Sequence, residues 1–202
     1  MEACVLLTER CLELKRNKEA VGYAEKAAAA LPENAGLQSL LGRALGARIG
    51  ELAFLQQGFV APRMLRAFKR SVELDPHHVP GLFGLANYYL YSPAIAGGDA
   101  GKADEYAARA EALAPYDGAI LRAQIRERQE QWADAAECYE RALRLQPSNP
   151  WLHAQVGAAR LKAGERGRAR AAFETVLALQ PDHAEAKAAL EALAVSIGSS
   201  DE

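Results

Sequence analysis

Five segments of fourteen residues in this chain align without gaps, and each segment closes with a proline. The closing prolines are Pro32, Pro76, Pro115, Pro147 and Pro181, at intervals of 44, 39, 32 and 34 residues. Because a proline cannot continue a helix, each of them fixes the end of one structural unit. A recurrence of this length predicts a chain that stacks copies of one helical unit.

Small and aromatic residues recur inside the segments at positions that share one face of a helix. The second position holds Ala20, Met64, Ala103, Ala135 or Ala169, an aromatic residue follows at Tyr23, Phe68, Tyr106, Tyr139 or Phe173, and Ala27, Ser71, Ala110, Ala142 or Val176 comes next. Small residues let two helices approach closely, and the aromatic ring fills the space beside them. We therefore expect each segment to be the second helix of a pair, with these positions buried.

The period of about 34 residues, the small and aromatic positions and the closing proline resemble the tetratricopeptide-repeat (TPR) family over nearly the whole chain. The resemblance implies an all-α fold, namely a right-handed α-solenoid of five TPR helix pairs with a C-terminal capping helix. The expected pairs cover residues 1–34, 35–78, 79–115, 116–147 and 148–181, and the cap covers residues 184–195. Residues 1–195 then form one solenoid domain, and residues 196–202 form a flexible tail.

The second and third repeats carry insertions of ten and five residues in the turn between their paired helices. In the second repeat, Leu52 and Gln56 continue the helical spacing, so the first helix is expected to run to Gln57 and the next to begin at Pro62. In the third repeat, Asp99 is expected to cap the following helix. A similar insertion from proline to a glycine pair makes residues 79–115 resemble an uncharacterised subset of bacterial TPR proteins.

Both insertions are expected on the same edge, because neighbouring repeats stack side by side. The apolar residues that would form this accessory edge are Leu52, Phe54, Phe59 and Ile95, together with Pro93. Two interpretations stay open. The residues either seal one another or leave an apolar patch that a partner recognises.

In TPR proteins the first helices of the pairs line a concave groove, and the resemblance assigns groove positions in this chain. They are Leu40, Arg43, Phe83, Asn87, Leu90, Tyr91, Gln155 and Lys162. The TPR domains that clamp the carboxylate tails of chaperones need a basic residue where Phe83 stands, so that specific function is not expected. An apolar, aromatic groove suits an amphipathic helix or an apolar peptide. Phe83 and Tyr91 are candidate anchors, although Phe83 fits packing against neighbouring repeats equally well.

The composition excludes several other classes of function. With 24 basic and 26 acidic residues, the chain lacks the basic surface that nucleic-acid binding requires. No apolar run approaches the roughly 18 residues of a membrane span. The cysteines Cys4, Cys11 and Cys138 suit core packing, and the four histidines have no ligand or catalytic partner at recognisable spacing. We expect no catalytic residue, no metal and no cofactor.

The sequence thus predicts a non-catalytic scaffold or adaptor that binds a protein or peptide partner in its groove. The alternative is a carrier of a small apolar ligand, associated with a transport or cell-envelope system. A homodimer formed through the ends of the solenoid stays open. Residues 1–12 lack the pattern of a signal peptide, which favours the cytoplasm, whereas a missing leader would place the protein in the periplasm or cell envelope.

Overall fold

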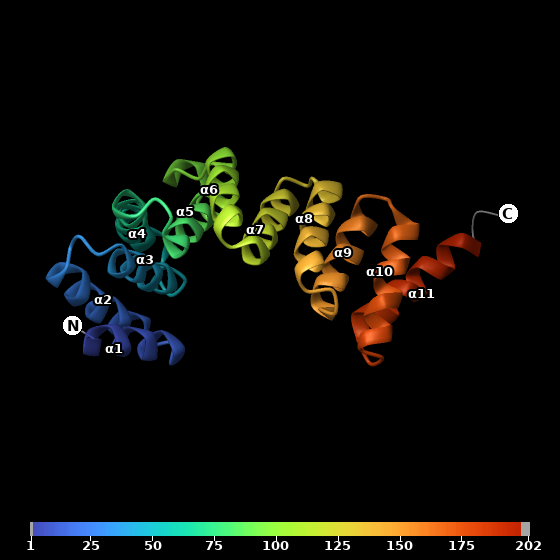
Figure 1. Cartoon of the computed structure of the whole chain (residues 1–202), viewed down its shortest axis with the longest axis horizontal. Coiled ribbons are helices and arrows are strands. Elements are labelled where there is room, and N and C mark those ends of the chain that lie inside the picture. The colour runs from blue at the N-terminus through green and yellow to red at the C-terminus, as the bar shows by residue number, and fades with distance from the viewer. Residues whose placement is uncertain (1, 199–202) are drawn as a thin grey trace. The chain divides into compact units, whose positions relative to one another are not determined.

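The computed structural model of the chain describes residues 2–198, and every regular element in that range is a helix (Figure 1). The chain divides into two compact units, Met1–Leu113 and Ala114–Glu202. Of the expected tail, residues 196–202, the part from residue 199 onward lies outside the described residues.

The first unit contains three pairs of antiparallel helices. Helix α1 (Glu2–Glu13) packs on α2 (Asn17–Ala30), α3 (Ala35–Ile49) packs on α4 (Phe54–Leu74), and α5 (Val79–Tyr91) packs on α6 (Ala100–Leu113). A short 3-10 helix, η1 (Ala94–Ala96), lies in the turn between α5 and α6. Consecutive pairs also touch, because α2 packs on α3 and α4 packs on α5.

The second unit repeats the arrangement with two pairs and one more helix. Helix α7 (Pro115–Arg128) packs on α8 (Trp132–Leu145), α9 (Pro150–Lys162) packs on α10 (Arg166–Leu179), and α11 (Ala184–Gly198) covers α10. Helix α11 continues three residues beyond the expected end of the cap. The predicted all-α fold of paired helices with a C-terminal capping helix is confirmed over the described residues.

The core of both units is built from the repeated small and aromatic positions. Fully or almost fully buried among them are Ala20, Ala27, Ser71, Ala103, Ala110, Ala135, Tyr139, Ala142, Ala169, Phe173 and Val176. Met64 differs from the alanines that stand at its position in the other four repeats, because it is only half-buried. The periodic pattern therefore identified the buried face of each second helix, although Tyr23 and Tyr106 at the aromatic position are, like Met64, only half-buried.

Glycines on the first helices make room for the aromatic rings. A Cβ atom on Gly157 would lie 2.8 Å from Cε1 of Phe173. In the first unit, Cβ atoms on Gly42 of α3 and Gly84 of α5 would lie 2.7 and 2.2 Å from the same ring edge of Phe68. Since real Cβ contacts are not this short, the Phe68 ring occupies space that only glycine leaves free on both neighbouring helices.

The insertion of the second repeat lengthens α4 rather than α3, so the prediction that the first helix continues to Gln57 is wrong. Helix α3 ends at Ile49, and Ala53 is extended, with φ −62° and ψ 150°. The carbonyl of Ala53 then accepts the N–H of Gln57 at 3.1 Å, which closes the first turn of α4. Pro62 lies inside α4, where its missing N–H leaves the carbonyl of Gly58 to solvent, to which Gly58 is exposed.

The insertion of the third repeat is held in one conformation by local contacts. The hydroxyl of Tyr88 donates to the carbonyl of Ala96 at 2.7 Å, and a Cβ on Gly98 would lie 1.9 Å from the carbonyl oxygen of Ser92. The predicted helix cap is confirmed, because Oδ1 of Asp99 accepts the N–H of Lys102 at 3.0 Å. This bond lowers the pKa of Asp99 below its ordinary value.

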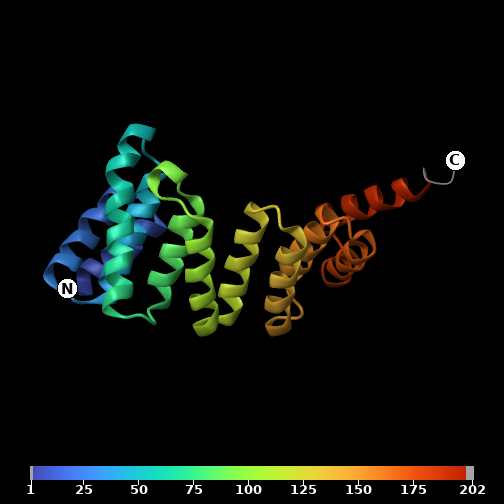
Figure 2. The same cartoon turned by 90° about the horizontal axis from the view of Figure 1, so that it is seen from above.

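The two insertions meet, as the sequence predicted. Helix α4 contacts η1, and Figure 2 shows the start of α4 and the turn that carries η1 at the same end of the first unit. The residues inserted into two different repeats therefore form one continuous edge.

Ser71 is a buried hydroxyl that makes no hydrogen bond to any described residue. The equivalent position holds alanine in three other repeats, at Ala27, Ala110 and Ala142. We expect Ser71→Ala to raise the free energy of unfolding by about 1 kcal/mol, because it removes an unsatisfied polar group without opening a large cavity. Urea denaturation followed by circular dichroism measures the change. A loss of stability would mean that the hydroxyl has a partner in solution.

Candidate functional site

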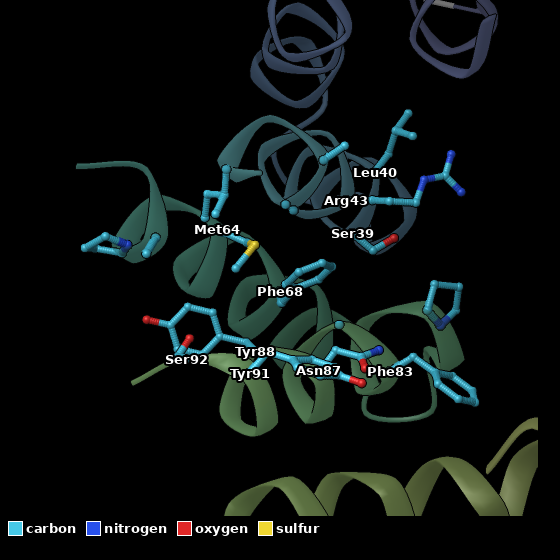
Figure 3. A pocket seen from close by; sticks show the side chains of 18 of the residues that line it. Ser39, Leu40, Arg43, Met64, Phe68, Phe83, Asn87, Tyr88, Tyr91 and Ser92 are labelled. Atoms are coloured by element: carbon cyan, nitrogen blue, oxygen red, sulfur yellow. The ribbon is translucent and has the colours of Figure 1, made fainter. Parts of the chain in front are cut away.

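A groove of about 1200 Å³ lies in the first unit, between α3 and α5, with α4 beneath it. Figure 3 shows Leu40 and Arg43 of α3 on one side, Phe83 and Asn87 of α5 on the other, and Met64 and Phe68 of α4 between them. The first helices of neighbouring pairs thus form the walls, and the second helix forms the floor.

The structure brings together many of the site residues predicted from the sequence. Those that line the groove are Leu40, Arg43, Phe83, Asn87 and Tyr91 from the groove set, and Phe54, Pro93 and Ile95 from the accessory edge. The groove and the edge were predicted as two features and are parts of one surface.

Other predicted residues lie elsewhere. Leu90 is buried, and neither Leu52 nor Phe59 lines the groove. Gln155 and Lys162 belong to the second unit, where the Lys162 Nζ atom lies 4.1 Å from the centre of the Trp132 ring. A cation over an aromatic face is a favourable contact within that unit.

The floor of the groove was not predicted from the sequence. Met64 and Phe68 occupy it, and Gly46 leaves Met64 room, since a Cβ there would lie 3.1 Å from its Sδ atom. The one available signal was Met64 itself, a long side chain where the other repeats have alanine. A flexible thioether on a groove floor can adapt to differently shaped apolar surfaces.

The accessory edge is uncovered. Of the predicted edge residues, Phe54 is 75% exposed, Phe59 80% and Ile95 94%, Pro93 is also exposed, and Leu52 is half-buried. The neighbouring Leu55 is 80% exposed. Side chains that sealed one another would be largely buried, so the interpretation of the edge as a mutually sealed cluster is wrong. An exposed apolar cluster at the end of a groove is typical of an interaction site.

At the other end of the groove, three side chains follow one another in space and superficially resemble a catalytic triad, namely Ser39, His78 and Asp75. The Ser39 Oγ atom lies 2.9 Å from His78 Nε2, but it also donates its single proton to the carbonyl of Gly36 at 2.9 Å. The Nδ1 atom of His78 is 4.0 Å from Asp75, too far for a hydrogen bond. Because the Ser39 hydroxyl donates its proton in a hydrogen bond to a carbonyl of its own helix, it is not poised to transfer that proton to the His78 imidazole.

The second unit contains a polar groove of about 780 Å³ built around a buried cation. Arg160 is 3% exposed and donates to Glu140 at 2.8 Å and Glu165 at 3.0 Å. Burial disfavours its charge, but the two carboxylates outweigh that effect and raise the pKa of Arg160. The residue therefore ties α8 to the turn after α9, which is a structural role.

Other chemistry has little support in the described part of the chain. Cys11 and Cys138 are buried as predicted, and Cys4 is partly buried. Between residues 2 and 198, no group of three or more histidine, cysteine or acidic side chains is arranged to hold a metal ion. No helix in that range combines the length and the apolar character that a membrane crossing requires.

The paired helices and their buried small and aromatic positions define a helical repeat protein, and comparison with known proteins specifies the repeat. Residues 125–164 match the family model of the TPR repeat. No curated protein matches the chain in sequence. The matched repeat and the fold confirm the resemblance to the tetratricopeptide-repeat family.

Several solved structures share the fold at low sequence identity. TTC0263, a thermophilic TPR protein of Thermus thermophilus, has a TM-score of 0.64 and 17% identity over 96% of this chain and 98% of its own. PilW, a widely conserved type IV pilus biogenesis factor, has a TM-score of 0.72 and 16% identity over 98% of this chain and 86% of its own. YrrB, a TPR protein with an unusual peptide-binding site, has a TM-score of 0.64 and 12% identity over 91% of this chain and 88% of its own.

Proposed function

We propose that this chain is a non-catalytic interaction scaffold, and that the groove of its first unit holds a segment of a protein partner. The observation that carries the proposal is the continuity of the groove with the uncovered apolar edge at Phe54 and Ile95. Burial of such a surface by a partner stabilises the complex, whereas leaving it in water does not.

The size of the groove supports a peptide or helix as its occupant. Sites for small molecules usually measure about 300–1,000 Å³, and this groove is larger. The fold is shared with YrrB, a TPR protein with a peptide-binding site, which is consistent with a peptide segment in a TPR groove.

The alternative of a small apolar ligand carrier is less well supported. A carrier shields its ligand from water, but Phe54, Leu55 and Ile95 at the insertion end of the groove are 75–94% exposed and enclose nothing. Mass spectrometry of the purified protein under native and then denaturing conditions separates the two functions. Release of a bound lipid or metabolite on denaturation would favour the carrier.

The scaffold is tested with two matched variants on α4. Phe54 lines the groove, whereas Phe59 is equally exposed on the same helix and does not line it. We expect Phe54→Ser to weaken binding of a partner fragment by about tenfold or more, since buried aromatic anchors dominate interface energy. Phe59→Ser is expected to leave the affinity almost unchanged.

The partner fragment comes from a display library of protein fragments of the source organism, selected on the wild-type chain. Fluorescence anisotropy then gives the dissociation constants for the wild-type chain and both variants, and circular dichroism shows whether the helices stay folded. Equal losses for Phe54→Ser and Phe59→Ser, or no loss for either, would contradict binding in the groove.

A further inference from the structure

The polar side chains of the groove are already engaged within the chain. Asn34 accepts the N–H of Leu37 at 3.0 Å, Gln57 donates to the carbonyl of Leu52 at 2.9 Å, and Tyr88 donates to the carbonyl of Ala96 at 2.7 Å. Ser39 contacts Gly36 and His78 as described above. A partner can therefore use only the hydrogen-bonding capacity that these bonds leave over, unless one of the bonds that hold the first unit together is given up.

Asn87 and Ser92 are exceptions. Asn87 lines the middle of the α5 wall and is half-buried, and neither its amide nor the Ser92 hydroxyl makes a side-chain hydrogen bond within the described chain. A partner therefore finds one amide side chain on this wall that is ready to pair without rearrangement.

The charges of the groove also cancel. Its arginine, Arg43, forms an ion pair with its glutamate, Glu9. An uncharged, apolar surface complements such a lining, because a charged group placed there would lose water without gaining an unpaired counter-charge.

The engaged polar side chains and the paired charges of the groove distinguish between an extended peptide and a helix as the bound segment. An extended peptide carries a free N–H and C=O on every residue, and those groups need partners once they leave water. The groove offers few, and the described chain has no strand edge on which such a peptide could pair. A helix satisfies its own backbone and presents only side chains.

The two insertions provide an exposed apolar surface on which the apolar face of a helix can pack. Phe54 and Leu55 at the start of α4 and Ile95 in η1 are exposed at one end of the groove, and Met64 and Phe68 continue the apolar surface along its floor. A helical stripe with apolar residues at i, i+3 or i+4, and i+7 covers a surface of this kind.

We propose that the occupant of the groove is a single amphipathic α-helix of a partner protein, whose apolar face lies on Met64 and Phe68 and contacts Phe54, Leu55 and Ile95. The proposal rests on the proposed function and specifies the form of its partner. The insertions are then the part of the chain that selects this partner, since they add the exposed apolar end of the groove.

A random library of displayed 18-residue peptides tests the proposal. Peptides are selected on the wild-type chain and counter-selected on the Phe54→Ser, Ile95→Ser double variant, so that only groove-dependent binders remain. We expect their apolar residues to recur with helical spacing and the peptides to gain helicity, measured by circular dichroism, when they bind.

Each selected peptide is then compared with two versions changed at one position on the face that carries no apolar residue. A proline there breaks the helix without removing a contact, and we expect it to weaken binding at least about tenfold. An alanine at the same position is the matched control and should leave the affinity unchanged.

The outcomes separate the two proposals. Groove-dependent peptides that alternate apolar and polar residues, or that tolerate the proline, would overturn the helical occupant and leave a peptide-binding scaffold in place. A selection that yields no groove-dependent peptide would contradict the proposed function itself.

Discussion

Phe68→Ala is expected to lower the free energy of unfolding by about 3–5 kcal/mol, which is the usual cost of removing a buried phenylalanine ring. Phe68 is 7% exposed, and its ring lies between α3 and α5 as well as under the groove. Its loss removes apolar burial and leaves a cavity that glycines on both sides cannot fill.

Urea denaturation followed by circular dichroism gives the change in free energy, and hydrogen exchange measured by mass spectrometry shows where protection is lost. We expect the loss in α3, α4 and α5. Phe59→Ala is the control, because Phe59 is 80% exposed and should change stability little. A change below about 1 kcal/mol for Phe68→Ala would show that the ring is not packed between the two helices.

Gly84→Ala is the second large effect, with an expected cost of about 1–3 kcal/mol through overpacking. The new Cβ would lie 2.2 Å from the edge of the Phe68 ring that also faces Gly42, so the ring has to shift to accommodate it. The usual preference of a helix for alanine over glycine is outweighed by this collision.

Gly22→Ala provides the opposite expectation on α2. Nothing lies within 4 Å of the Cβ added there, so the substitution should stabilise the chain by up to about 1 kcal/mol.

In a Phe68→Ala background, Gly84→Ala should lose most of its cost, since the ring that the new Cβ strikes is gone. Equal costs in the two backgrounds would refute the contact.

The repeat pattern predicted most of the fold because each second helix buries the same small and aromatic positions against its own partner. Ala20, Ala103, Ala135 and Ala169 could be placed in the core from spacing alone. Contacts of this kind are short in sequence, so the period of the chain contains them.

The path of the insertion in the second repeat could not be predicted in the same way. Apolar spacing through Leu52 and Gln56 fits a longer first helix as well as a turn followed by an earlier second helix. The hydrogen bonds of Gln57 to Leu52 and Ala53 favour the second path, and periodicity carries no information about them.

The candidate site was predicted in separate pieces. Phe83 and Asn87 followed from the family groove, and Phe54 and Ile95 followed from the insertions. Their union depends on α4 reaching η1 and on Phe68 reaching Gly84, which are contacts between the second and third repeats. Met64 lies on the floor of the groove, although the repeat pattern marked its position as core.

Methyl NMR of Met64 tests the occupied groove most directly. The chain has two methionines, Met1 and Met64, so labelling methionine methyl groups gives one reporter on the groove floor and one at the first residue of the chain. Titration with a selected partner fragment should shift the Met64 resonance, assigned with Met64→Leu, in proportion to binding and leave the Met1 resonance in place. An unchanged Met64 resonance at saturating, independently measured binding would contradict a partner in this groove.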